Sequence, residues 1–186
     1  MPNPPSPAAA AAALRPSEPW AEVRARDHVM RYRRAGAGRA VVVLHPAHTA
    51  SDGAALWPGT ADALVAARFR VIVPELLPTT TDAGDVAVWL LDFLDGLGAE
   101  GVAVVATEPL CVAALELALL DADRVSRVVL VPGGRADETG LDGALATSTR
   151  ASSVPLLVVR RGLPAADALP LVTRFLSGRE AAAPTG

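Results

Sequence analysis

Residues 22–46 read EVRARDHVMRYRRAGAGRAVVVLHP, and this stretch decides the fold. Apolar and polar residues alternate over residues 21–32 on both sides of a polar turn at Asp27 and His28, which is typical of a β-hairpin. A glycine turn follows at residues 36–38, and an uninterrupted apolar run follows at residues 40–44. Such runs are typical of central strands that are covered on both faces. The stretch therefore predicts a hairpin that leads into the middle of a sheet.

Further apolar runs follow along the chain, and helical segments with the 3.6-residue period separate them. We predict strands at residues 71–73, 102–105, 128–131 and 155–159, and helices at residues 57–67, 85–97, 109–120 and 169–176. Gly98 is the predicted C-cap of the second helix. A hairpin followed by strand–helix alternation predicts an α/β fold, a doubly wound and mostly parallel sheet of about seven strands with helices on both faces.

The composition predicts one domain with a sizeable core, because 51% of the 186 residues are hydrophobic. We assign residues 19–178 to this single domain. Residues 1–18 and 179–186 are rich in alanine and proline, and we expect both to be disordered tails. No run approaches the ~20 apolar residues of a membrane span, so no membrane contact is expected.

Charge and cysteine content exclude several classes of function. The net charge is only −3 and no basic stripe is present, which argues against nucleic-acid binding. All 17 basic residues are arginines, so no lysine is available for a Schiff base. Cys111 is the sole cysteine and is expected in the core, which fits a cytoplasmic protein without an internal disulfide.

The order of the segments resembles that of the α/β-hydrolase family. Residues 22–46 resemble its opening hairpin and third strand, including the Gly-x-Gly turn and the histidine at the strand end. FRVIVPELLP at 69–78 resembles the fourth strand, AALELALLDA at 113–122 the helix after the nucleophile, and DRVSRVVLV at 123–131 the sixth strand. The resemblance covers roughly residues 21–177 and implies an α/β-hydrolase-like domain.

The resemblance also places the family's catalytic turn, Gly-x-Ser-x-Gly, on residues 106–110, which read ATEPL. Glu108 stands where the family has its serine, and Leu110 stands where it has a glycine. Pro109 follows the nucleophile position and has no N–H to donate to an oxyanion, a loss that typically costs ~2.7–4 kcal/mol of transition-state stabilisation. The turn is therefore not that of a conventional serine hydrolase.

The remaining parts of the family's machinery are also missing from the sequence. No histidine follows His48, and no aspartate stands in register after the strand at 155–159. About twenty residues separate residues 131 and 154, which leaves no room for a lid. The resemblance thus implies a degenerate member, a pseudo-hydrolase without the Ser-His-Asp triad, lid and last strand.

Three interpretations of Glu108 stay open at this point. It is a nucleophile, as the aspartate is in the dehalogenase and epoxide-hydrolase branches, or it is a general acid or base. Alternatively, Thr107 or Glu108 caps the following helix and Pro109 takes the first helical position.

The other candidate site residues stand at the carboxyl ends of the predicted strands, where ligands bind in such sheets. His45 and His48 are expected to assist Glu108, although His45 also fits a role in organising its loop. Glu75 and Arg160, together with Pro109, are assigned to substrate binding, while Glu75 also fits a structural role in holding loops, and solvent exposure is the usual outcome for an arginine such as Arg160.

We expect no metal and no organic cofactor. Two histidines and Glu108 are possible ligands, but they come from two loops without a recognised spacing. The leading hypothesis is an enzyme of specialised biosynthesis that moves a proton on a small molecule, as an isomerase, lyase or cyclase. The alternatives are a non-catalytic binding or interaction module, and an unconventional ester or thioester hydrolase. The exposed edge at residues 155–159 predicts a homodimer.

Overall fold

The computed structural model describes residues 20–26, 28–45, 60–75, 82–132 and 141–178, without the side chains of residues 148–150. The predicted tails, residues 1–18 and 179–186, lie outside these ranges. The elements are β1 (Ala21–Ala25), β2 (His28–Ala35), β3 (Arg39–Leu44), α1 (Thr60–Ala66), β4 (Phe69–Pro74), α2 (Ala83–Leu97), β5 (Val102–Thr107), α3 (Cys111–Leu120), β6 (Val125–Val131), α4 (Leu141–Ala151), β7 (Leu156–Val158) and α5 (Ala165–Leu176). In this part of the chain no helix is long and apolar enough to cross a membrane.

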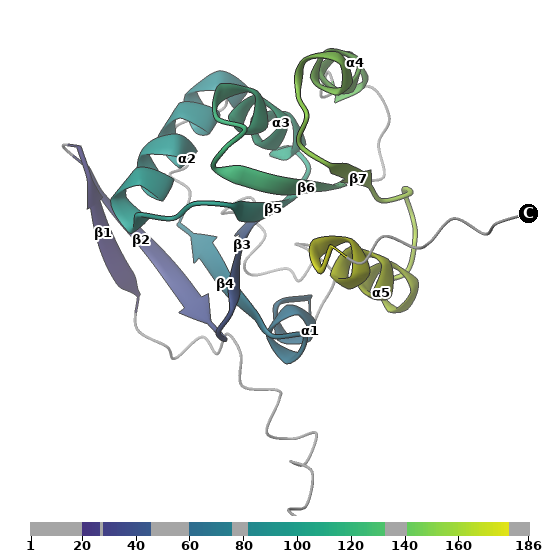
Figure 1. Cartoon of the computed structure of the whole chain (residues 1–186), viewed down its shortest axis with the longest axis horizontal. Coiled ribbons are helices and arrows are strands. Elements are labelled where there is room, and N and C mark those ends of the chain that lie inside the picture. The colour runs from purple at the N-terminus through teal and green to yellow at the C-terminus, as the bar shows by residue number, and fades with distance from the viewer. Residues whose placement is uncertain (1–19, 27, 46–59, 76–81, 133–140, 179–186) are drawn as a thin grey trace, which may run out of the picture.

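The strands form one sheet in the order β1-β2-β4-β3-β5-β6-β7 (Figure 1). The β1–β2 hairpin is antiparallel, and β2 joins β4 in antiparallel register. From β4 to β7 every neighbouring pair is parallel. The predicted fold class is confirmed, and within the described residues the sheet ends at β7.

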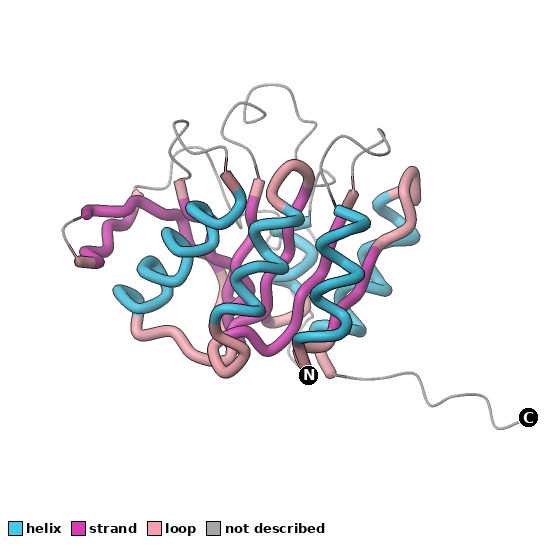
Figure 2. The backbone as a smooth tube through the Cα atoms, turned by 90° about the horizontal axis from the view of Figure 1, so that it is seen from above, coloured by secondary structure: helices cyan, strands magenta, loops and turns pink. Residues whose placement is uncertain are grey.

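Helices cover both faces of the parallel part of the sheet, as the tube view shows (Figure 2). Side chains of β3 alternate between the faces, so that Val42 and Leu44 join a core with α2 and α3, whereas Val41 and Val43 join a second core with α1 and α5. All of these side chains are buried. The apolar runs in the sequence reflect this burial on two faces.

The glycine turn between β2 and β3 fixes how the hairpin meets the sheet. Gly36 and Gly38 have φ angles of 75° and 109°, a region that favours glycine. A Cβ atom at Gly36 would lie 2.3 Å from the carbonyl oxygen of Phe69, and one at Gly38 would lie 2.3 Å from that of Arg68. The turn can therefore press against the start of β4 because neither residue carries a side chain.

Helix α2 has well-defined caps at both ends, whereas helix α4 was not expected from the sequence. Gly98 is the left-handed C-cap of α2, as predicted, and Asp82 caps its start by accepting from the N–H groups of Gly84 and Asp85. Helix α4 was not predicted from the sequence. Among the side chains of LDGALATSTRA that the structure describes, Leu141 alone is in the buried class, and the sequence lacks the wide apolar face that marks a helix.

Candidate active site

The carboxyl ends of the parallel strands bring several predicted site residues to one edge of the sheet. Leu44 on β3 lies in register with Ala106 on β5, which lies in register with Leu130 on β6 and, through it, with Val158 on β7. The residues that follow each of these positions therefore leave the sheet at similar heights. His45 and Glu108 follow neighbouring strands, and both are half-buried.

The turn after β5 is built differently from the predicted helix cap. The Thr107 hydroxyl donates to the carbonyl oxygen of Leu44 at 3.3 Å, a contact across the sheet to β3. The N–H of Leu110 donates to the carbonyl oxygen of Thr107 at 2.7 Å, which closes a four-residue turn around a cis Glu108–Pro109 peptide bond. Helix α3 begins only at Cys111, and its N-cap residue Leu110 makes no side-chain cap bond.

The prediction that Thr107 or Glu108 caps α3 and that Pro109 opens it is therefore wrong. The physical reason is that a backbone turn intervenes between the strand and the helix, and it carries Glu108 and Pro109 before the first helical residue. Leu110, half-buried, packs against the core beneath α2 and α3. The carboxylate of Glu108 is thus held at the strand end itself.

Cys111 lies under this turn and is affected by Glu108. Its Sγ is buried and contacts the carbonyl oxygen of Ala106 at 3.5 Å. Burial, helped by the negative charge of Glu108, raises the pKa of the Cys111 thiol to about 12, and a backbone hydrogen bond from Val131 opposes the shift. The thiol stays protonated at neutral pH, so the structure agrees with the prediction that Cys111 is a small core residue.

Of the two histidines in the predicted site, the structure describes His45 and not His48. His45 follows β3 directly and lies beside the β5 end, whereas His48 lies outside the described residues. Within the described ranges no group of three or more His, Cys, Asp or Glu side chains is arranged to hold a metal ion.

Glu75 follows β4 and turns toward the hairpin. Its carboxylate lies 3.4 Å from Nη1 of Arg31, and its N–H donates to the Arg31 carbonyl oxygen at 2.8 Å. The guanidinium groups of Arg31 and Arg33 both lie over the ring of Trp20, at 5.3 and 4.5 Å. The sequence prediction did not include Arg31, because the antiparallel β2–β4 register that brings it to Glu75 joins distant parts of the chain.

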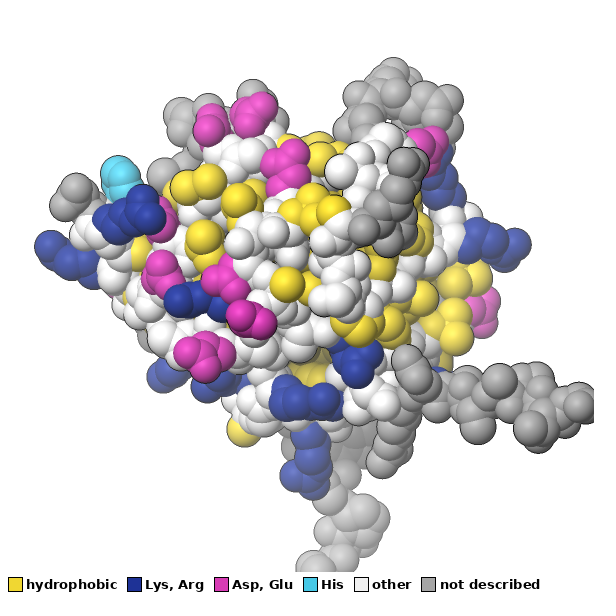
Figure 3. Space-filling model, turned by 45° about the horizontal axis from the view of Figure 1, so that its top comes forward, with side chains coloured by type: hydrophobic (Ala, Val, Ile, Leu, Met, Phe, Trp, Pro, Cys, Tyr) yellow, Lys and Arg dark blue, Asp and Glu magenta, His cyan; other side chains and the backbone are white. Residues whose placement is uncertain are grey.

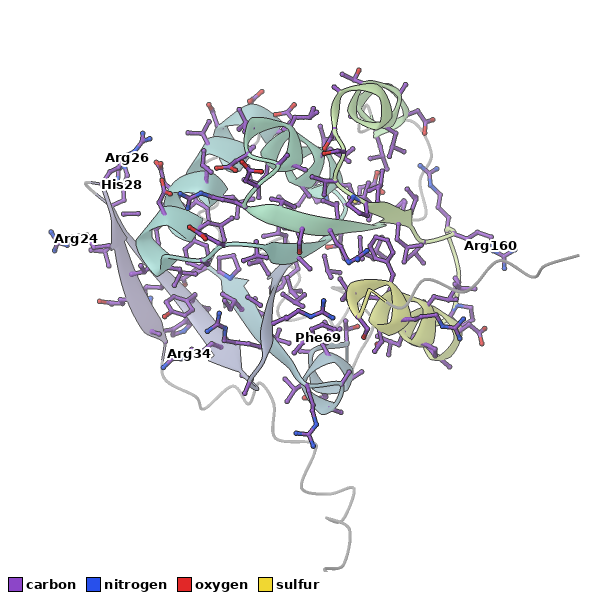
Figure 4. The ribbon with its side chains drawn as sticks, viewed as in Figure 1. Arg24, Arg26, His28, Arg34, Phe69 and Arg160 are labelled. Carbon is purple, nitrogen blue, oxygen red and sulfur yellow. The ribbon has the colours of Figure 1, made fainter. Side chains whose placement is uncertain are left out.

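Arg160 follows β7 and is exposed at the end of the sheet. Its side chain points outward, away from the strands (Figure 4). Because β6 separates β7 from β5, the two strands that Arg160 and Glu108 follow are two strand spacings apart, about 10 Å.

A separate hollow lies between α1 and α5 and has a volume of about 490 Å³. It is lined by Ala63, Ala166, Leu169, Pro170, Thr173, Arg174 and Ser177. None of the predicted site residues lines it, so it is distinct from the strand-end site.

Solved structures that resemble this chain include several hydrolases. A predicted CIB-like hydrolase from Thermoplasma acidophilum matches with a TM-score of 0.62 and 12% identity, over 86% of this chain and 98% of the other. A dienelactone hydrolase from Anabaena variabilis matches with a TM-score of 0.62 and 16% identity, over 87% and 95%. The chain has the α/β-hydrolase fold.

An α/β hydrolase from a lagoon-sediment metagenome of Mar Chica, Morocco, gives a TM-score of 0.58 with 15% identity, over 81% of this chain and 95% of the other. No protein-family model matches the sequence, and no curated protein sequence matches it either. At these identities the structural likeness establishes the fold alone, so the chemistry has to be argued from this chain's own residues.

Proposed function

We propose that this protein is a non-hydrolytic proton-transfer enzyme for a small molecule, with Glu108 as the general acid or base. The observation that carries the proposal is the position of Glu108. Glu108 is half-buried and stands at the carboxyl end of β5, in the turn where this fold keeps its nucleophile and before the first residue of α3.

The rest of the turn argues against hydrolysis through a covalent acyl intermediate. Residues 106–110 contain no serine, and Pro109 has no N–H to stabilise an oxyanion. A carboxylate can take a proton from an acidic C–H group without a covalent intermediate, and the oxygen that receives the electron pair then needs a donor other than the Pro109 position. In the proposed step Glu108 takes that proton, and the electron pair moves to a neighbouring carbonyl group. The protonated carboxyl then returns the proton to another carbon or to a leaving group.

The turn that carries Glu108 is anchored to the core, because the strand ends beside it are formed by buried aliphatic residues, including Leu44 and Ala106. His45 supports the assignment because it leaves the neighbouring strand at almost the same height and can bind or protonate the carbonyl oxygen. Isomerisation, elimination and cyclisation all begin with this transfer, so the proposal covers these three reaction types.

Solvent deuterium exchange tests the proposal without knowledge of the product. The protein is incubated in D2O with a panel of lactones, enones and β-dicarbonyl compounds, and deuterium uptake is followed by NMR. We expect catalysed uptake for at least one compound, and loss of at least a hundredfold of that rate in Glu108→Gln, since general acid–base catalysis contributes about 10²–10⁴-fold.

The matched control is Glu100→Gln, which removes an exposed carboxylate just before β5, at the opposite end of the same strand. It should leave the exchange rate unchanged. Full deuterium-exchange activity in Glu108→Gln would contradict the proposal. Binding of panel compounds without any exchange would instead favour the non-catalytic binding module, and turnover of esters or thioesters would favour hydrolysis.

A further inference from the structure

The two edges of the sheet differ in how they are protected. The β1 edge strand, AEVRA, carries Glu22 and Arg24, and charges on an edge discourage pairing with another chain. The β7 edge carries no charged side chain, because residues 151–159 read ASSVPLLVV. Figure 3 shows dark-blue side chains at the hairpin end, and yellow side chains together with some dark-blue ones toward the opposite end.

The outer backbone groups of β7 point away from the sheet. Val128 donates to the carbonyl oxygen of Pro155 at 2.9 Å, and Val159 donates to that of Leu130 at 2.8 Å. Because inward and outward groups alternate along a strand, Leu156 and Val158 direct their N–H and C=O groups outward. Within the described residues these outward groups have no backbone partner. The Val158 side chain is also 41% exposed.

We propose that two copies of this chain pair through β7, antiparallel and around a two-fold axis at Leu157, so that their sheets become continuous. In this register Leu156 of each copy stands opposite Val158 of the other, and each pair exchanges both N–H···O bonds. The two Leu157 residues then face each other as a non-hydrogen-bonded pair. This symmetry makes the interface isologous, as in most homodimers.

The side chains along this register fit a second copy. Apolar residues face apolar residues through the centre, and Arg160 of each copy stands opposite Val154 of the other, so that no arginine faces an arginine. Leu156 packs on the core beneath α2 and α3, and Leu157 packs on the opposite core with α5. The pairing therefore extends both apolar layers of the molecule across the two-fold axis.

Light scattering on the full chain gives the first test. The wild type should have twice the monomer mass of 19.1 kDa. Val158→Lys should return the protein to the monomer mass, because it places a charge on the pairing edge. The control is Val29→Lys, which changes a valine of 53% exposure near the opposite edge and should leave the dimer intact.

Cysteine cross-linking gives a second test that does not depend on how Val158→Lys folds. Leu157→Cys should form a disulfide-linked dimer on oxidation, since facing residues in a non-hydrogen-bonded pair lie about 4.5 Å apart between Cα atoms, within disulfide range. Val158→Cys should cross-link far less, because Val158 faces Leu156. A monomeric wild type would overturn the proposal. A dimer that persists in Val158→Lys and forms no Leu157→Cys cross-link would overturn it as well.

Discussion

The hydroxyl group of Thr107 donates a hydrogen bond to the carbonyl oxygen of Leu44 across 3.3 Å, and this bond joins the carboxyl ends of the central strands β3 and β5. Both residues are buried. The bond fixes the point at which the chain leaves β5, and with it the position of Glu108 relative to His45. The strand-end site therefore depends on a contact that spans 63 residues of sequence.

Replacing the hydroxyl should weaken the fold at this point. Thr107→Val keeps the shape and removes the donor, and we expect the free energy of unfolding to fall by about 1 kcal/mol. Urea denaturation measures the change. Thr107→Ser keeps a hydroxyl and should lose less. The control is Thr147→Val on α4, where an exposed hydroxyl donates to Gly143 at 3.1 Å, and its effect should stay within about 0.5 kcal/mol. An equal loss in both valine variants would contradict this account.

The glycine turn should tolerate no side chain. Gly36→Ala forces a residue with a Cβ into a left-handed conformation, at a cost of roughly 1–2 kcal/mol, and presses that atom toward the Phe69 carbonyl oxygen 2.3 Å away. The melting temperature should therefore drop.

Gly143→Ala is the matched control for the glycine turn. Gly143 lies within α4, where an added Cβ atom would meet open space, and the alanine variant should gain about 0.5–1 kcal/mol from reduced backbone entropy. A Gly36→Ala protein as stable as the wild type would show that the turn can move away from β4.

The elements that could be predicted from sequence are those with a strong local signal. The buried runs of β3 and β5 and the Gly98 cap belong to this group, because two-sided burial and a left-handed C-cap leave clear marks in the sequence. Helix α4 leaves no such mark, since it has few large apolar residues and Leu141 alone is buried among its described side chains.

The place of Glu108 directly after β5 could be predicted from the sequence, but the turn that holds it could not. Proline favours the first turn of a helix, so the sequence pattern at Glu108-Pro109 predicted a cap. The structure instead uses the Thr107 hydroxyl across the sheet, and a sequence pattern cannot report that tertiary contact. The Arg31–Glu75 pair was missed for a similar reason, because it depends on the register between β2 and β4.

Cys111 should react slowly with thiol reagents in the native protein. Its pKa of about 12, against an ordinary value of 9.0, reduces the thiolate population at pH 8 by roughly a thousandfold, and burial also blocks access. Alkylation followed by mass spectrometry should show slow native labelling and fast labelling in denaturant. Rapid native labelling would contradict the buried environment.

The same shift in the Cys111 pKa predicts a dependence of stability on pH. Because the folded pKa is raised above the unfolded value, the contribution is fully present below pH 9.0 and is lost as pH rises toward about 12. Wild type should therefore lose more stability than Cys111→Ala across this window, in parallel urea titrations. Identical slopes for the two proteins would show that the native thiol ionises as easily as the unfolded one.

Glu75 and Glu108 should respond differently to the same substitution. Glu75 was predicted to bind substrate, but its carboxylate pairs with Arg31 at 3.4 Å, and the two side chains are 38% and 46% exposed. An ion pair this exposed contributes within about 0–1 kcal/mol, so Glu75→Gln should leave the melting temperature almost unchanged. If Glu75 supports the hairpin alone, the variant should also keep full deuterium-exchange activity, whereas Glu108→Gln loses it.

A raised KM with unchanged kcat in Glu75→Gln would instead assign Glu75 to substrate binding. Arg31→Gln separates these two explanations, because it removes the same ion pair and leaves the Glu75 carboxylate in place. Wild-type kinetics in both variants would confine catalysis to the β3 and β5 strand ends. A KM increase in Glu75→Gln alone would extend the substrate site across β4, since that result requires the carboxylate itself and not its pairing with the hairpin.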